Sequence, residues 1–162
     1  MQLTRFTDYS LRVLIHLGNH PDAQATVAGL ATEHGISRHH LTRVVHRLGI
    51  KGYIETVRGK GGGFRLARRP EQIRIGDVVR DMETGFELAE CFRPGESACR
   101  LLPACALKPA LAEAGRAFLA SLDRYTLTDL LPPSAPGLSA ATVLQDRDLE
   151  KTPAVTGKAS RG

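Results

Sequence analysis

Residues 35–48 read GISRHHLTRVVHRL, and this stretch decides the fold. Gly35 suits the left-handed position that follows a helix, and Ser37 is a preferred residue at a helix N-cap. Gly35-Ile36-Ser37 is therefore a three-residue turn between two helices, which we predict at Val27–His34 and from Arg38 to about Lys51. This spacing is typical of a helix-turn-helix.

The helix that begins at Arg38 has two distinct faces. At about 100° per residue, Leu41, Val44, Val45 and Leu48 share one arc and are expected to face the core, while the opposite face is polar. The first residues of the second helix of a helix-turn-helix reach base edges, and its N-terminus suits a phosphate. The predicted DNA-contacting residues here are Ser37, Arg38, His39, His40 and Arg43. The alternative is a face that is merely solvated.

A glycine-rich segment follows this helix. An alternating run at 53–58, glycines at 59 and 61–63 and a second run at 64–66 predict a β-hairpin with a basic tip, or wing. Arg58 and Lys60 would contact phosphates or the minor groove. The glycines could instead form a nucleotide-phosphate loop, but no Gly-Lys-Ser/Thr follows and the run does not open a helix.

Three further helices extend this pattern. Thr4 or Thr7 caps a first helix to about His20, with Leu11, Leu14, Ile15 and Gly18 expected on one face. Ile75–Met82 forms a short amphipathic helix, and a long one runs from Ala106 to about Tyr125. The predicted fold is mainly α with a small β-hairpin, a winged helix-turn-helix plus a long helix. We divide the chain into a DNA-binding domain at 1–83, a cysteine loop at 84–105, the helix at 106–131 and a disordered Pro- and Ala-rich tail at 132–162.

Composition supports a nucleic-acid-binding protein. The 162 residues, with 42% apolar and 5% aromatic side chains and no Trp, fit one modest helical core plus appendages. The net charge is +5, and residues 38–69 hold nine Lys and Arg but one acid, Glu55. A solvated surface normally mixes signs, so this bias favours a polyanionic partner. No signal peptide or bilayer-length apolar run is visible, and we expect a cytoplasmic protein without membrane contact.

Three cysteines are spaced Cys91-x7-Cys99-x5-Cys105. An odd count cannot pair fully within the chain, and without an export signal it indicates metal or redox chemistry. Structural zinc usually shows close ligand pairs, whereas widely spaced thiolates suit an iron–sulfur cluster. Three thiolates leave one iron to be ligated from elsewhere. Redox-active or inert thiols and zinc remain alternatives. An electron carrier or iron–sulfur enzyme subunit would leave the basic helix and wing without a role, and we expect no enzyme.

Several motifs resemble the Rrf family of winged-helix regulators, most closely its nitric-oxide-sensitive repressors. The resemblance covers residues 1–131 and leaves out the tail. It rests on Leu3-Thr4-x-Phe6-Thr7-Asp8-Tyr9, Ile36-Ser37-Arg38-x-His40, Val57-Arg58-Gly59-Lys60-x-Gly62-Gly63-x-Arg65-Leu66, Ile73-Arg74-Ile75-Gly76-Asp77-Val78-Val79, the three cysteines with Pro103-Ala104-Cys105-x-Leu107-Lys108, and Asp123-x-Tyr125-Thr126-Leu127.

The resemblance implies a homodimer whose seam is the long helix from Ala106. It implies that Cys91, Cys99 and Cys105 hold the cluster, with [4Fe–4S] favoured over [2Fe–2S], and that the cluster-bound form binds a palindromic double-stranded operator. Nitric oxide would nitrosylate the cluster, release the DNA and de-repress detoxification genes. In some family members the fourth ligand is an aspartate early in the first helix of the other subunit, and Asp8 is the matching residue here. The alternative for Asp8 is a first-turn carboxylate that suits the helix dipole.

Two features depart from the family pattern. The seven-residue gap between Cys91 and Cys99 is longer than in the relatives compared first. Lys108 stands where a regulator that senses cluster status has a histidine, which argues against that redox- or cluster-sensing alternative. His34 could ligate a cluster in a redox-sensing relative, but at a helix end we expect it to be solvated.

Overall fold

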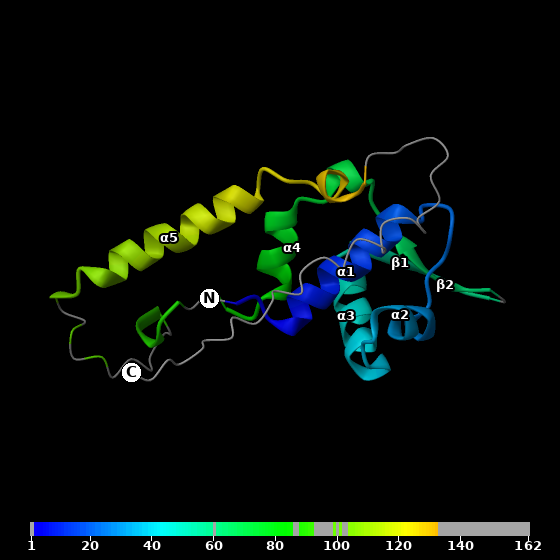
Figure 1. Cartoon of the computed structure of the whole chain (residues 1–162), viewed down its shortest axis with the longest axis horizontal. Helices are drawn as coiled ribbons and strands as arrows, with labels where there is room; N and C mark the ends of the chain where they lie inside the picture. The colour runs from blue at the N-terminus through cyan, green and yellow to red at the C-terminus, as the bar shows by residue number, and fades with distance from the viewer. Residues whose placement is uncertain are drawn as a thin grey trace, which may run out of the picture. The chain divides into compact units, whose positions relative to one another are not determined.

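The computed structural model describes residues 2–59, 61–85, 88–92, 99, 101 and 104–132, which fall within one compact unit, Met1–Pro132. The tail at 133–162, expected to be disordered, lies outside the described residues. The elements are α1 Arg5–Asn19, α2 Val27–His34, α3 Arg38–Ile50, β1 Ile54–Val57, β2 Gly63–Leu66, α4 Ile75–Met82 and α5 Leu107–Leu122, with short 3₁₀ turns at Pro70–Gln72, Glu90–Phe92 and Thr128–Leu130 (Figure 1). The mainly α fold with one β-hairpin is as predicted.

Side-chain caps set the helix starts. The Ser37 hydroxyl accepts a hydrogen bond from the His40 backbone N–H at 3.3 Å, and Thr4 and Thr26 cap α1 and α2 in the same way. Gly35 ends α2 at φ 63°, a left-handed conformation that glycine adopts without strain. The predicted turn between α2 and α3 is therefore present, and α3 leaves it with its N-terminal N–H groups exposed.

The core lies between α1, α2, α3 and α4. Leu41, Val44 and Leu48 of α3 are fully buried, as their helical phase predicts, and Val45 packs partly buried against them. The expected face of α1 was only partly right. Val13, Leu14 and Leu17 are buried, whereas Leu11 and Ile15 lie at the core edge. The buried arc is broad because α1 packs against both α3 and α4.

The wing is an antiparallel hairpin in which Val57 pairs with Gly63 and Ile54 with Leu66. A third segment joins it, since Ala25 and Phe64 exchange both backbone hydrogen bonds at 3.0 and 2.9 Å. A side chain at position 63 would meet the Ala25 carbonyl oxygen at 2.3 Å, so only glycine allows this approach. The wing is thereby anchored to the loop before α2.

The long helix α5 ends at Leu122, earlier than expected, and Tyr125 is not helical. Instead the Tyr125 carbonyl accepts from the Ile75 N–H at 2.9 Å, and the Leu127 N–H donates to the Ile73 carbonyl at 2.8 Å. Leu127 is fully buried. Pairing with the segment before α4 competes successfully with another helical turn because it buries Leu127.

Helix α5 packs on α4 and has no fully buried residue. Its end is held by a two-pronged ion pair, in which the Arg80 guanidinium donates to both carboxylate oxygens of Asp123 at 2.6 Å. In the described part of the chain, no helix combines the length and apolar character that a membrane crossing requires.

Candidate nucleic-acid interface and metal ligands

The outer edge of α3 is a continuous exposed polar surface. The residues predicted to contact DNA from this helix, Ser37, Arg38, His39, His40 and Arg43, are all exposed. Within the described residues, the guanidinium groups of Arg38 and Arg43 form no ion pair and no hydrogen bond, although the Arg38 backbone carbonyl accepts from the Thr42 hydroxyl at 2.8 Å. Their charges are therefore available to an outside anion. The Ser37 hydroxyl caps the helix by accepting a hydrogen bond from the His40 N–H.

The basic block is less uniform than its composition indicated. Arg65 forms a cross-strand ion pair with Glu55 at 2.7 Å, and Lys51 pairs with Asp81 at 2.5 Å. The Arg68 guanidinium lies 5.0 Å from the centre of the Tyr53 ring. These three cations are committed to the fold. Arg58, at the wing tip, is exposed, whereas Lys60 lies outside the described residues.

Asp81 ties the end of α3 to α4. Its two carboxylate oxygens accept from the Lys51 ammonium at 2.5 Å and from the Tyr53 hydroxyl at 2.8 Å. Burial alone would raise the pKa of Asp81, but these hydrogen bonds hold it below its ordinary value of 3.8. Burial and the same bond raise the pKa of Tyr53. The network fixes the C-terminal end of α3 relative to α4.

A cavity of about 730 Å³ lies between the start of α1, the exposed edge of α3 and the end of α4. Phe6 and Tyr9 line it from α1, and His40 and Arg43 line it from α3. The rings of Tyr9 and His40 are 6.3 Å apart. The first turn of α1, which carries Asp8, therefore lies next to the exposed edge of α3.

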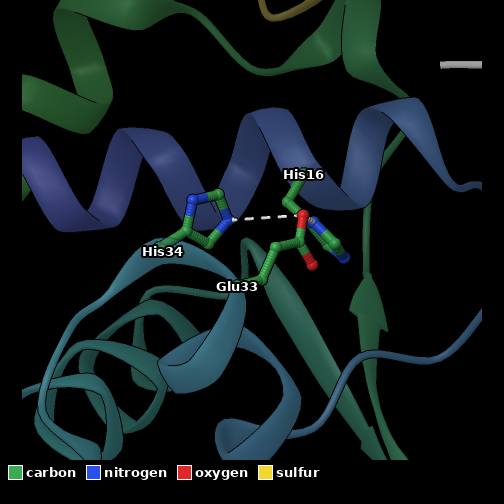
Figure 2. A group of neighbouring side chains, drawn as sticks. All are labelled: His16, Glu33 and His34. Carbon is green, nitrogen blue, oxygen red and sulfur yellow. Dashed lines mark hydrogen bonds and ion pairs between the residues drawn. The ribbon is translucent and has the colours of Figure 1, made fainter. Parts of the chain in front are cut away.

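A group of possible metal ligands was missed by the sequence analysis. Within the described residues, the ligand atoms of His16, Glu33 and His34 all lie within 4.8 Å of one another (Figure 2). The expectation that His34 is solvated was wrong, because its side chain is 23% exposed and packs beside His16. The sequence does place His16 and His20 one helical turn apart, a spacing that brings two histidines onto one face of a helix. The approach of α2 to α1 was not visible in the sequence.

The predicted cluster ligands are present but are not gathered around one point. None of the three cysteines forms a disulfide, and each is half-buried. Although all three are described, their sulfur atoms do not all lie within 4.8 Å of one another. The Lys108 ammonium lies 5.8 Å from the Phe92 ring, so the segments of Cys91 and Cys105 are neighbours. The three free thiols, one of them directly before the N-terminus of α5, fit an iron–sulfur cluster in donor type and would supply three of its four protein ligands.

Asp8 lies in the first turn of α1, where a carboxylate is favourable to the helix dipole. The Arg12 guanidinium pairs with it at 3.0 Å. The side chain is 44% exposed. The Asp8 carboxylate is thus accessible to a group from outside the chain. To bind that group, it would have to break its ion pair with Arg12.

Comparison with known proteins settles the family. A family model described as Rrf2, iron-dependent transcriptional regulator, matches residues 3–133. The chain belongs to the Rrf2 family. It is 49% identical over 132 residues to the HTH-type transcriptional regulator NsrR of Bacillus subtilis, which covers 81% of this chain and 90% of the relative. NsrR of Geobacillus kaustophilus is 48% identical over 148 residues, 91% of this chain and 99% of the relative.

Solved structures agree with this Rrf2 assignment. The crystal structure of Staphylococcus aureus CymR is similar with a TM-score of 0.63 and 28% identity, over 78% of this chain and 95% of that one. As an Rrf2 member the chain is a DNA-binding transcriptional regulator and not an enzyme, as expected.

Proposed function

We propose that this chain is a homodimeric cytoplasmic repressor that binds palindromic operator DNA in its iron–sulfur form and releases it in response to nitric oxide, de-repressing nitric-oxide detoxification genes. The observation that carries the proposal is the exposed edge of α3, where the guanidinium groups of Arg38 and Arg43 have no ion-pair or hydrogen-bond partner among the described residues. The similarity to regulators named NsrR supports the choice of signal.

The DNA contacts divide into two kinds. Arg43 would donate to both guanine O6 and N7 in the major groove, a contact that specifies sequence, and His39 and His40 would reach neighbouring bases. The N-terminal turn at Ser37, with Arg58 and Lys60 of the wing, would hold phosphates and set the register. The proposed contact set is Ser37, Arg38, His39, His40, Arg43, Arg58 and Lys60.

Dimerisation through α5 follows from its unburied apolar side chains. Leu107 is 63% exposed, and Leu111, Phe118 and Leu122 follow it at helical spacing without being fully buried. A second copy would cover this stripe. A two-fold dimer presents two α3 helices to half-sites about one DNA turn, roughly 34 Å, apart, which is why we expect a palindrome.

Cys91, Cys99 and Cys105 would hold the cluster, with [4Fe–4S] favoured and [2Fe–2S] as the other form. When bound, its irons supply the chemistry that reacts with nitric oxide. The partner subunit's Asp8 would complete the ligand set, as a harder and more easily replaced ligand than thiolate. Asp8 directly precedes Tyr9, whose ring lies 6.3 Å from His40. Movement of the first turn of α1 would therefore reach the DNA-reading edge of α3.

The decisive experiment uses the full chain purified without oxygen. A cluster gives a brown protein with visible absorption, whereas zinc gives a colourless one. Operator binding by gel shift should then fall as nitric oxide is added, in step with the loss of the visible bands. Release by an oxidant but not by nitric oxide would replace this proposal with a redox sensor of the same fold. Colourless, metal-bound protein that still binds DNA would make it a structural-zinc module.

A further inference from the structure

We propose that His16, Glu33 and His34 form a second metal site, separate from the cysteines, that binds a first-row divalent cation such as Zn²⁺ between α1 and α2. The site joins the last turns of two helices that follow each other in the sequence (Figure 2). It does not depend on the proposed iron–sulfur function.

The three side chains are already close to a ligand arrangement. The Glu33 Oε1 atom lies 3.1 Å from His16 Nδ1 and 4.0 Å from His34 Nε2. Ligand atoms of a tetrahedral zinc site lie about 2 Å from the metal. A cation would bind where these three atoms converge and would replace the contact between His16 and Glu33. Figure 2 shows the carboxylate lying between the two imidazole rings.

His34 supplies the second observation. Its Nε2 atom is buried and has no hydrogen-bond partner within the described residues. A buried polar atom left without a partner costs about 1–3 kcal/mol, and such atoms are rare in native proteins. A metal–nitrogen bond would satisfy this atom directly.

The donor set selects the type of cation. Two imidazoles and one carboxylate suit Zn²⁺ and its neighbours, whereas Mg²⁺ and Ca²⁺ prefer oxygen ligands only. The Glu33 side chain is 54% exposed, which gives the cation a path from solvent and leaves room for a water ligand. His20 stacks on His16 at 4.5 Å and binds its backbone carbonyl, so the ring of His16 is held in place.

We expect cation binding at this site to stabilise the DNA-binding domain at 1–83. A cation that binds only when α1 and α2 are packed together stabilises the folded state in proportion to its concentration over its Kd. The site lies in the last turn of α2, directly before the Gly35 turn into α3. The cation would thus stabilise the helix-turn-helix itself.

Titration of the full chain with Co²⁺, whose visible bands report its ligands, tests the proposal. Wild type should bind one Co²⁺ per chain with bands typical of nitrogen and oxygen ligands, and His34→Gln should lose it. His46→Gln, which removes an exposed histidine elsewhere, is the matched control and should bind Co²⁺ as wild type does. Saturating Zn²⁺ should raise the Tm of wild type and His46→Gln but not of His34→Gln.

Glu33→Gln provides a second variant in case His34→Gln does not fold, because Glu33 is largely exposed. It should bind Co²⁺ about tenfold or more weakly. Equal Co²⁺ stoichiometry and affinity in wild type, Glu33→Gln and any folded His34→Gln would overturn the proposal. So would a spectrum whose only cobalt-dependent bands are thiolate charge transfer, because the cation would then lie on the cysteines alone.

Discussion

Arg43 is the residue that we propose to read DNA sequence. It is exposed on α3, has no ion-pair partner among the described residues, and lies opposite the buried Val44 and Leu48 contacts that fix the helix. Truncating it removes no contact that the fold uses. Its loss should therefore be seen in DNA recognition and not in stability.

Arg43→Ala should cost about 1–3 kcal/mol of binding free energy at its cognate base pair and relax the preference there. Fluorescence anisotropy with the operator and with single-base variants measures both effects. Arg65→Ala is the control, because Arg65 is paired with Glu55. An equal loss on every sequence would show that Arg43 binds only phosphate.

Asp81 should make the free energy of unfolding depend on pH in the acidic range. Its pKa is lower in the folded protein, so its contribution is complete above its ordinary pKa of 3.8 and is lost as the pH falls through the folded value. Asp81→Asn should lower the free energy of unfolding by about 1–3 kcal/mol at pH 7. This difference should shrink below about pH 4. Urea melts across this pH range test it, and a constant difference would contradict it.

Asp8 tests the proposed fourth ligand. Asp8→Ala should still give brown protein under anaerobic conditions, but with a more labile cluster and altered reactivity toward nitric oxide, because three thiolates remain. Asp8→Cys should resist nitric oxide. Arg12→Ala is the control, since it breaks the same ion pair and keeps the carboxylate. If Asp8→Ala matched wild type in spectrum and lability, Asp8 would be only a helix-terminus charge.

At the scale of elements, the wing is held rigidly at its base. Gly63 lies so close to the Ala25 carbonyl that a side chain would collide with it, and Arg65 bridges to Glu55 across the strands. The exposed Arg58 starts the tip. A rigid base with a basic tip is suited to phosphate contact without base reading.

Lys60→Ala should accordingly weaken binding to all DNA sequences alike and lower the slope of log K against log salt by about one. Binding measured at several salt concentrations, on operator and on random duplex, provides the test. Arg68→Ala, whose guanidinium lies over Tyr53, should leave the slope unchanged. A loss confined to the operator would mean that Lys60 reads bases.

At the scale of the whole molecule, α5 is the element that a single chain leaves incompletely covered. It contacts α4 and is secured at its end by Arg80 and Asp123, yet none of its residues is fully buried. The apolar stripe that begins at Leu107 needs a partner surface. The dimer is therefore expected to form through this helix.

In the protein without a cluster, Leu107→Glu should shift the dimer to a monomer. The Tm of the DNA-binding domain at 1–83 should not fall, because Leu107 is exposed in the single chain. Arg116→Glu, about half a helical turn away in phase, is the control and should remain dimeric. Sedimentation velocity distinguishes the two states. A Leu107→Glu protein that stays dimeric would place the seam elsewhere.

The sequence by itself determined the elements whose signals are local. Capping by Ser37, the left-handed Gly35 and the 3.6-residue period of Leu41, Val44 and Leu48 depend on neighbours in the chain, so α2, α3 and the exposed polar edge of α3 were predictable. The hairpin followed from its glycines and alternating strands for the same reason.

Only the tertiary structure decided which of these groups meet. It pairs Ala25 with Phe64, ends α5 so that Leu127 can be buried, and commits Arg65, Lys51 and Arg68 to the fold. It also brings His16 to Glu33 and His34 across two helices. These contacts depend on how separate elements pack, and packing energy is shared among residues distant in sequence, so no local pattern carries it.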